Sequence, residues 1–277
     1  MVVHNLVAPV VKWAGGKRQI IEHIKKYVPE SFATYYEPFV GGGAVLFALQ
    51  PDNAVVNDIN SELINIYEVI KDNVEELLED LKKHKNEEDY FYKIRELDRD
   101  KEKYRKLSSI QRASRIIYLN KTCYNGLFRV NKAGEFNTPF GNYKKANIVN
   151  EATLRAVSAY FNRANISFFR KDYAEVLENA GPEDFVYLDP PYDPVSETAD
   201  FTGYAKDGFS RDEQIRLKKV CDKLDHKGIR FLLSNSATDF IKELYKDYHI
   251  EIIQAKRTVN SKADGRGAID EVLVMNY

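Results

Sequence analysis

The segment FVYLDPPYDP, residues 185–194, carries residue types suited to chemistry in this chain of 277 residues. An apolar run ends in Asp189, and two prolines and Tyr192 follow it. Proline cannot donate a hydrogen bond to a sheet, and a carboxylate at the tip of a buried strand needs partners or a cavity. The segment therefore predicts a strand whose end holds a ligand.

The chemistry that Asp-Pro-Pro-Tyr suits is activation of an amino group on a base. The lone pair of such an amine is delocalised into the ring, so the nitrogen is a poor nucleophile. Asp189 and the carbonyl group of Pro190 can each accept one N–H, which moves the nitrogen toward tetrahedral geometry and frees its lone pair. The prolines fix the backbone so that a carbonyl points into the pocket. Tyr192 can then stack on a base that has been flipped out of a duplex.

Other predicted strand ends carry glycines or acids. Residues 35–49, YYEPFVGGGAVLFAL, predict a strand, a turn containing Gly41 and Gly43, and a helix. This order brings backbone close to a ligand at the carboxyl edge of a sheet, although a tight turn without a ligand explains it equally well. Asp58 ends the next strand and can accept both ribose hydroxyls of a nucleoside, or simply cap a helix. Asp172 closes the third strand, so acids end three successive strands.

The elements that must position these residues alternate along the chain. Short apolar runs bounded by turn residues predict strands at 34–39, 53–58, 166–172, 184–189, 229–235, 249–255 and 270–277. A helical period between them predicts helices at 17–27, 43–49, 60–83, 150–163, 173–179, 210–226 and 238–246. The alternation is typical of an α/β fold with a mainly parallel sheet, closed here by an antiparallel final pair of strands.

Residues 60–150 interrupt the alternation. They contain no strongly apolar strand and predict a largely helical insertion with one β-hairpin at 127–140, where NKAG supplies the turn. Within it, residues 111–150 hold seven cations and one acid, interleaved with aromatic residues. Such a mixture suits a nucleic-acid surface. On charge alone, a solvated face whose aromatic residues anchor a small core is the slightly better explanation.

Composition excludes several classes of protein. The formal net charge is −1, no apolar run is long enough to span a bilayer, and the N-terminus does not resemble a signal peptide. Two cysteines predict a reducing compartment and no disulfide framework. The stretch KWAGGKRQI is not a P-loop, because Val11 and Arg18 stand where that motif needs glycine and Ser or Thr. Lys17, at a predicted helix start, could meet a carboxylate.

Six motifs occur in order along nearly the whole chain: KWAGGK, EPFVGGG, NDIN, YNGLFRVN…GEFNTPFG, YLDPPY and LSNS. Together they resemble the Dam family, the D12 class of DNA adenine-N6 methyltransferases, in its GATC-methylating branch. The resemblance implies a Rossmann-like S-adenosylmethionine-dependent methyltransferase sheet. It assigns 1–59 and 150–277 to the catalytic domain and 60–149 to an inserted DNA target-recognition domain. The implied cofactor is S-adenosyl-L-methionine, with S-adenosyl-L-homocysteine as product and no metal.

The resemblance also implies roles for single residues. Asp189, Pro190 and Tyr192 would be catalytic, with Asp189 between cofactor and target base. Asp58 would take the ribose hydroxyls, Asp172 the cofactor adenine, and the turn at 37–43 the methionine portion. The full cofactor-binding set would be Trp13, Lys17, Glu37, Phe39, Gly41, Gly43, Asp58, Asp172 and Asp189.

For DNA, the resemblance implies that Tyr124 is a wedge beside the flipped adenine, with Asn125 next to it. Arg129 would read a guanine edge. The full DNA-binding set would be Lys12, Tyr124, Asn125, Leu127, Arg129 and Pro139. Phe128 lies among these residues at a position that we do not expect to be fixed.

The expected reaction is direct in-line attack of adenine N6 on the methyl group, with double-stranded DNA as partner. A C5-cytosine enzyme would need a cysteine after proline, but Cys123 follows Thr122 and Cys221 follows Val220. Zinc deaminase motifs are absent. Methylation of ribosomal RNA and a DNA-binding module without catalysis remain alternatives. We expect a cytoplasmic protein, encoded by a prokaryote or a phage and without membrane contact. A functionally paired restriction endonuclease that makes no stable contact is left open.

Overall fold

The computed structural model describes residues 4–13, 15–195, 209–256 and 268–277. The chain forms two compact units, and both are discontinuous in sequence. Unit 1 comprises Met1–Gly16, Gly41–Asp52 and Asp58–Arg170. Unit 2 comprises Lys17–Val40, Asn53–Asn57 and Lys171–Tyr277. In the described ranges, no helix is both long and apolar enough to cross a membrane.

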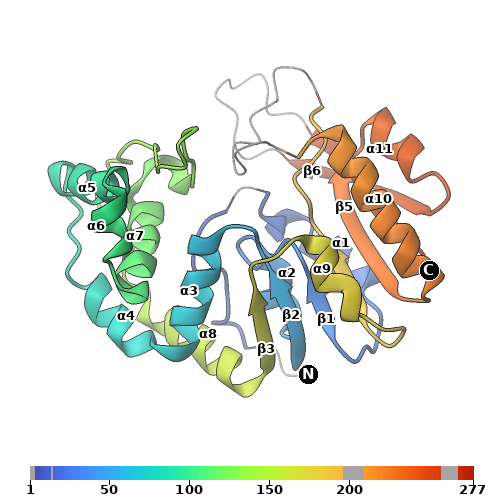
Figure 1. The fold of residues 1–277 in the computed structure, drawn as a ribbon, viewed down its shortest axis with the longest axis horizontal. Coiled ribbons are helices and arrows are strands. Elements are labelled where there is room, and N and C mark those ends of the chain that lie inside the picture. Colours follow the sequence, from blue (N-terminus) through green and yellow to red (C-terminus); the bar gives the residue numbers. More distant parts are fainter. Residues whose placement is uncertain (1–3, 14, 196–208, 257–267) are drawn as a thin grey trace. The chain divides into compact units, whose positions relative to one another are not determined.

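Unit 2 is built on a mainly parallel sheet (Figure 1). Its strands are β1 (Tyr35–Glu37), β2 (Asn53–Asn57), β4 (Phe185–Leu188), β5 (Arg230–Ser236), β6 (His249–Lys256) and β7 (Ala268–Met275). They lie in the order β2-β1-β4-β5-β7-β6. Strand β7 runs antiparallel to both β5 and β6, whereas the other pairs are parallel. The predicted antiparallel closure is therefore confirmed.

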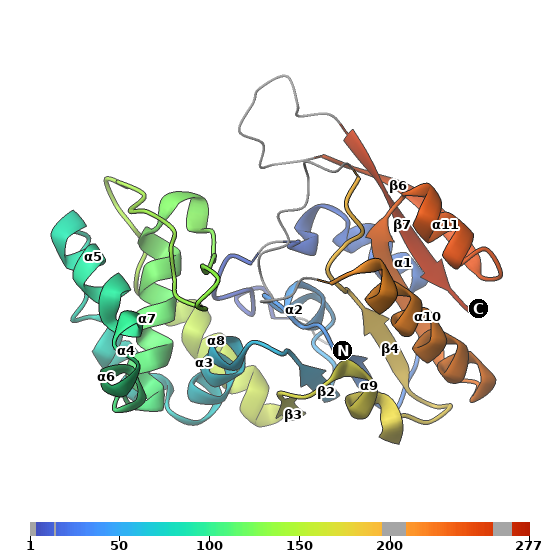
Figure 2. The same cartoon turned by 45° about the horizontal axis from the view of Figure 1, so that its top comes forward.

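The central strand β4 is the continuous apolar run FVYL, as is typical of a parallel strand that is covered on both faces. Every residue of β1 and β4 is buried. Helix α10 runs along β5 (Figures 1 and 2). The helical elements of this unit are η1 (Lys17–Gln19), α1 (Ile21–Tyr27), α9 (Tyr173–Val176), η4 (Leu177–Asn179), α10 (Arg211–His226) and α11 (Asp239–Leu244).

Unit 1 is mainly helical, and its longest helix, α7, is buried along much of its length. The unit contains α2 (Ala44–Leu49), α3 (Ser61–Asp72), α4 (Val74–Leu81), α5 (Glu88–Arg95), η2 (Glu96–Arg99), α6 (Lys101–Arg105), α7 (Ser109–Thr122), η3 (Tyr124–Gly126), α8 (Glu151–Arg163) and β3 (Asn165–Phe169). Helices α3 and α4 both pack against α7. Side chains that pack around α7 therefore form much of the core of this unit.

The mixed α/β class and the helical stretch between the second and third strands are confirmed, with three local differences. The predicted helix at 60–83 is broken at Asn73, where φ is −139° and ψ is 41°. The predicted hairpin at 127–140 has no continuous strands and is represented by the isolated antiparallel bridge Val130↔Phe136. Ser210 caps α10 through the N–H of Glu213, while a complete capping box occurs instead at Ser108. The boundaries of the functional domains stay a prediction.

Candidate active site and recognition loop

Asp189 directly follows β4 and is held by two side chains of unit 2. Its Oδ1 atom lies 2.8 Å from Lys17 Nζ and accepts a 2.9 Å hydrogen bond from Ser234 Oγ. Ser234 belongs to β5, the parallel neighbour of β4, so the sheet itself brings the hydroxyl beside the carboxylate. The Lys17 side chain is only 5% exposed and that of Asp189 is 19% exposed. The carboxylate that the sequence predicted for Lys17 is thus Asp189.

A second acid lies in the same group of residues. Glu271 of β7 accepts a 2.9 Å hydrogen bond from the Tyr192 hydroxyl, and Lys17 Nζ lies 4.5 Å from the Tyr192 ring centroid. Burial raises the pKa of Asp189, and the positive charge of Lys17 opposes that shift. Burial also raises the pKa of Glu271. The positive charge of Lys17 thus offsets the negative charges of Asp189 and Glu271. The hydrogen bond to Glu271 fixes Tyr192 through its hydroxyl group.

The carbonyl groups of Pro190 and Pro191 differ in their hydrogen bonds. Gln214 Nε2 of α10 donates a 2.9 Å hydrogen bond to the Pro191 carbonyl, and Asn235 Nδ2 donates to Gln214 Oε1 at 3.1 Å. Asn235 Oδ1 accepts the Asp193 N–H at 3.0 Å. No hydrogen bond reaches the Pro190 carbonyl from any residue that the structure describes. One acceptor therefore stays available immediately after Asp189.

The remaining predicted residues of unit 2 lie near its other strand ends. Glu37 Oε2 accepts a 2.9 Å hydrogen bond from Tyr35, and the Phe39 ring packs 5.1 Å from that of Tyr173. Asp172 caps α9 and receives two hydrogen bonds from Arg216, at 2.7 and 2.9 Å. The Arg216 guanidinium lowers the pKa of Asp172. A structural role alone therefore accounts for the position of Asp172.

Asn57, the last residue of β2, ties two neighbouring segments of unit 2 together. Its side-chain nitrogen donates to the carbonyls of Pro38, at 3.0 Å, and Lys171, at 3.1 Å. Its side-chain oxygen accepts the Lys171 N–H at 2.8 Å. The buried amide thus fixes the backbone beside both Phe39 and Asp172.

In unit 1, the glycine turn packs against Trp13 and is held by Asp58. Gly41 and Gly43 have φ values of +49° and +71°, a region that favours glycine. Asp58 Oδ2 accepts the Gly41 N–H at 3.1 Å, and Oδ1 accepts the Asn60 N–H at 2.8 Å. Burial raises the pKa of Asp58 from 3.8 to about 6. A Cβ atom at Gly41 would lie 3.2 Å from Trp13 Cδ1.

These residues fit a nucleoside-containing cofactor, because an acid and a turn without side chains lie together in unit 1. They equally satisfy one another in its absence: a Cβ atom at Gly42 would lie 3.1 Å from Trp13 Cβ, so packing on Trp13 also favours glycine there. The predicted grouping of Trp13, Gly41 and Asp58 is observed, whereas their binding role stays a prediction.

Most of the predicted DNA-binding residues belong to residues 123–141, which we call the recognition loop. Tyr124 is 56% exposed, and its N–H donates to the Pro139 carbonyl at 2.9 Å. Asn125 adopts a positive φ of 55°, and the Leu127 carbonyl accepts a 2.7 Å hydrogen bond from Thr138. Contacts between side chains and backbone therefore shape this loop where a continuous ladder is missing. Arg129 is exposed and donates through Nε to Asn137 Oδ1 at 2.8 Å.

Lys12 and Trp13 are attached to the recognition loop within unit 1. Asn120 Oδ1 accepts the Lys12 N–H at 2.7 Å, and Asn120 Nδ2 donates to the carbonyls of Lys12 and Gly126. The Trp13 ring stacks on that of Phe128, with centroids 4.6 Å apart and an interplanar angle of 22°. Phe128 is buried, and our expectation that this position is not fixed stays a prediction.

Sequence reasoning missed several residues that position these groups. Ser234 and Asn235 lie in LSNS, so the motif itself was a usable signal. Glu271 follows Asp270 in a mainly apolar strand and gave no signal. Arg216 and Asn120 lie on amphipathic helices, where a polar residue is ordinarily read as part of a solvated face. Only the fold shows that Asn120 is buried.

Comparison with known proteins places these features in context. Residues 13–259 match the family described as D12 class N6 adenine-specific DNA methyltransferase. The Type II methyltransferase M1.LlaDCHI of Lactococcus lactis subsp. cremoris is 45% identical, over 97% of this chain and 95% of that protein. The Type II methyltransferase M.MjaIII of Methanocaldococcus jannaschii is 42% identical, over 98% and 99%. The DNA adenine methylase of Escherichia coli K12 is 33% identical, over 96% and 94%.

Proposed function

The chain belongs to the D12 class N6 adenine-specific DNA methyltransferase family, and from this premise we propose that it methylates adenine within GATC in duplex DNA by flipping the base and attacking in line. The membership makes it an enzyme that acts on DNA and uses S-adenosyl-L-methionine. The choice of GATC depends on the match of the recognition loop to the GATC-methylating branch. The observation that carries the mechanism is the pair of acceptors at Asp189 and Pro190.

We propose that Asp189 and the Pro190 carbonyl each accept one N–H of the adenine amino group. The Pro190 carbonyl has no partner among the described residues, and Asp189 is held only by side chains. The amino group would share Asp189 with Lys17 or replace it there, because a carboxylate has lone pairs for several donors. Tyr192, fixed by Glu271, would stack on the base. The methylated N6 would release one proton to solvent, and the chain would contribute more by positioning than by acid–base catalysis.

S-adenosyl-L-methionine, when bound, supplies a methyl group activated by a positively charged sulfur, and the product is S-adenosyl-L-homocysteine. We propose that Asp58 accepts the ribose hydroxyls and that the turn at Gly41 and Gly43 lets backbone approach the cofactor. Trp13 would border it in unit 1. In unit 2 the proposed contacts are Lys17, Glu37, Phe39, Asp172 and Asp189. No step in this proposal requires a metal ion.

For DNA, we propose that the segment 60–149 is the target-recognition domain. Tyr124 would enter the duplex beside the flipped adenine, with Asn125 as its neighbour, because this exposed ring stands at the start of the recognition loop. Arg129 would read a guanine edge, since Nε is bound by Asn137 and its outer nitrogens can form a bidentate contact. Lys12, Leu127 and Pro139 complete the proposed interface.

We further propose that the enzyme works in a prokaryotic cytoplasm beside a restriction endonuclease that it does not bind. Two of the proteins compared above carry Type II methyltransferase names and are 45% and 42% identical to this chain, against 33% for the Escherichia coli DNA adenine methylase. Those names describe the relatives, and they are the support for a protective role here.

Methyl transfer to defined duplexes tests the proposal. The purified protein is incubated with labelled S-adenosyl-L-methionine and a duplex that contains one GATC, and the modified base is identified by mass spectrometry. Matched duplexes carry one changed base at each position, and a ribosomal RNA transcript serves as a further substrate. We expect N6-methyladenine in GATC alone. Methylation of the altered duplexes at equal rates would remove GATC from the proposal, and methylation of RNA alone would overturn it.

A further inference from the structure

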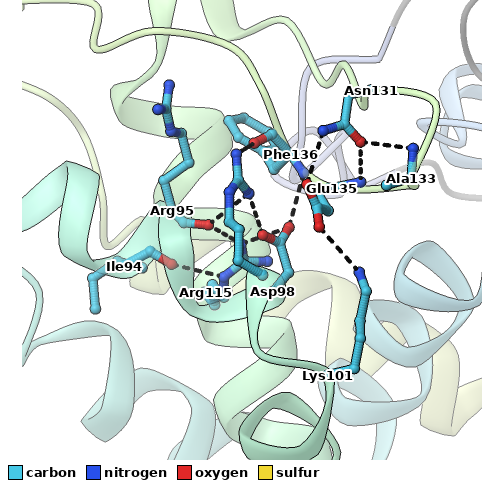
Figure 3. A network of polar contacts seen from close by, with 10 residues as sticks. Ile94, Arg95, Asp98, Lys101, Arg115, Asn131, Ala133, Glu135 and Phe136 are labelled. Atoms are coloured by element: carbon cyan, nitrogen blue, oxygen red, sulfur yellow. Dashed lines mark hydrogen bonds and ion pairs between the residues drawn. The ribbon is translucent and has the colours of Figure 1, made fainter.

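A partly buried cluster of charged side chains in unit 1 holds the recognition loop at Phe136 (Figure 3). Asp98 Oδ2 accepts the Phe136 N–H at 2.8 Å, and Arg99 Nη2 donates to the Phe136 carbonyl at 2.7 Å. Arg99 also pairs with Asp98. Both backbone groups of one loop residue are thus bound by two consecutive side chains, as a neighbouring strand would bind them. We call Asp98, Arg99 and Arg115 the Phe136 clamp.

Arg115 fixes the clamp to the helices of the unit. Its Nη2 atom lies 2.9 Å from Asp98 Oδ2, and its side chain donates to the carbonyls of Ile94 and Arg95 at 2.9 and 2.7 Å. Arg115 is 2% exposed and Asp98 6%, so neither belongs to a solvated surface. Removal of either partner would be strongly destabilising, because it would leave an uncompensated buried charge.

From Phe136 the constraint continues to Arg129. Asn137, the next residue, donates its backbone N–H to the Arg129 carbonyl at 3.0 Å. Its side-chain oxygen accepts from Arg129 Nε at 2.8 Å. Asn137 therefore binds both the backbone carbonyl and the guanidinium of Arg129. Because Asn137 follows Phe136 in the chain, the clamp on Phe136 also restricts the position of Asn137. The Phe136 ring also meets Phe128 edge-on, at 5.7 Å between centroids, on the other side of Arg129 in sequence.

We propose that the Phe136 clamp sets the discrimination of the target base that Arg129 reads. Asp98, Arg99 and Arg115 are positioning residues that act through Phe136 and Asn137 on the direction of the Arg129 guanidinium. The inference rests on the proposed function, because it takes Arg129 as a base reader. It goes further, because it makes residues outside the recognition loop, of which Asp98 and Arg115 are buried, determinants of sequence preference.

The test compares Arg99→Met with Lys101→Met. Both variants lose one cation near the loop, but among the described residues Lys101 pairs only with Glu135, at 3.8 Å, and its side chain is half exposed. Duplexes with each single base change are methylated, and kcat/KM is divided by that of the preferred duplex. Arg99→Met should lower discrimination about tenfold at the base pair that Arg129→Ala relaxes, because small displacements near a reading group are costly. Lys101→Met should match the wild type within about twofold.

Two further variants separate positioning from lost stability. Arg99→Lys keeps one donor and should recover part of the discrimination. Asn137→Ala leaves the clamp and the backbone hydrogen bond in place but frees the Arg129 guanidinium, and it should relax the same base pair even where Arg99→Met folds poorly. The double variant with Arg99→Met and Arg129→Ala should discriminate no worse than Arg129→Ala, because the two changes remove one interaction.

Normal discrimination in folded Arg99→Met, or an equal loss at every base pair, would overturn the inference while leaving the proposed function intact. Normal discrimination in Asn137→Ala would overturn it as well. Failure of the wild-type protein to methylate any duplex would overturn the proposed function and the inference with it.

Discussion

The strand end after β4 and the recognition loop solve the same problem by different means. Asp189 and its neighbours follow a strand that is paired on both sides, so the parallel ladder sets their position. The recognition loop has isolated bridges only, and the side chains of Asp98 and Arg99 take the place of a paired strand. Under the proposed function, the chemistry would therefore depend on the sheet, and the reading of the DNA sequence would depend on side-chain contacts. Damage to the first should lower rate, and damage to the second should lower discrimination.

The largest effect should follow a change at the strand end. Asp189→Asn keeps the size of the side chain but replaces the charged acceptor and removes the ion pair with Lys17. Methyl transfer at saturating substrates should fall at least about a hundredfold, the scale of losing one preorganised polar contact to a reacting group. Single-turnover kinetics measure it, and circular dichroism checks the fold.

Asp222→Asn is the matched control for that change. It removes the same charge from α10, where Asp222 pairs with Lys218. Its rate should stay within about twofold of the wild type, as is usual for surface positions. A folded Asp189→Asn variant with the activity of this control would exclude Asp189 from the chemistry.

In the recognition loop, Arg129→Ala should relax the preference at one base pair by about 1–3 kcal/mol and change the rate on the preferred duplex less than the ratio between duplexes. The measurement is kcat/KM across duplexes with single base changes. Lys132→Ala, in the same loop and also exposed, is the control and should keep the preference. An identical pattern in the two variants would show that loop charge, and not a base contact, is being measured.

A smaller effect should appear as a pH dependence of cofactor binding. Burial raises the pKa of Asp58 to about 6, so the carboxylate that would accept ribose hydroxyls is lost as pH falls below that value. Affinity for S-adenosyl-L-homocysteine should weaken about tenfold per pH unit below it. Isothermal titration calorimetry measures this affinity between about pH 5 and 8, the range in which proteins are ordinarily stable.

The titration of Asp58 affects folding stability and cofactor binding in opposite directions as pH changes. Because the folded pKa of Asp58 is raised, its contribution to stability is fully present below the ordinary value of 3.8 and is lost as pH rises through about 6. Asp58→Asn should flatten the pH profile of binding. A profile that keeps its slope in this variant would assign the titration to another group.

The smallest effect should distinguish the ring of Tyr192 from its hydroxyl. Tyr192→Phe loses the hydrogen bond to Glu271 but keeps the stacking surface, so the rate should fall less than about tenfold. Tyr192→Ala also loses the ring and should cost a further 1–3 kcal/mol, roughly the value of one base stacked on an aromatic side chain. Equal rates in both variants would mean that the ring does not meet the base.

Much of the sheet could be predicted from sequence because buried parallel strands are written as short apolar runs. The placement of Asp58, Asp172 and Asp189 at strand ends followed from those runs. Long-range partners could not be predicted in this way. Glu271 meets Tyr192 across 79 residues, and Phe136 is bound by Asp98 across 38. Such pairs depend on tertiary packing, which a local period does not contain.

Local sequence patterns also gave wrong predictions where tertiary packing determines the structure. The helical period through residues 60–83 continues past Asn73, yet the chain leaves helical geometry there. NKAG predicted a regular hairpin, but the turn is organised by Asn131, whose side chain accepts the N–H groups of Ala133 and Glu135. The family resemblance pointed to Arg129. The Phe136 clamp, in contrast, consists of aspartate and arginine residues, which occur on any charged surface. Only the packing of the helical elements, which the local sequence does not show, turns Asp98 and Arg115 inward.

The central claim is that Asp189 and the Pro190 carbonyl grip the amino group of the target adenine. A crystal structure with S-adenosyl-L-homocysteine and a GATC duplex tests it directly. The account predicts an everted adenine whose N6 lies about 3 Å from both Asp189 Oδ and the Pro190 carbonyl oxygen. An adenine that remains stacked in the duplex, or that is everted but bound away from both oxygens, would contradict it.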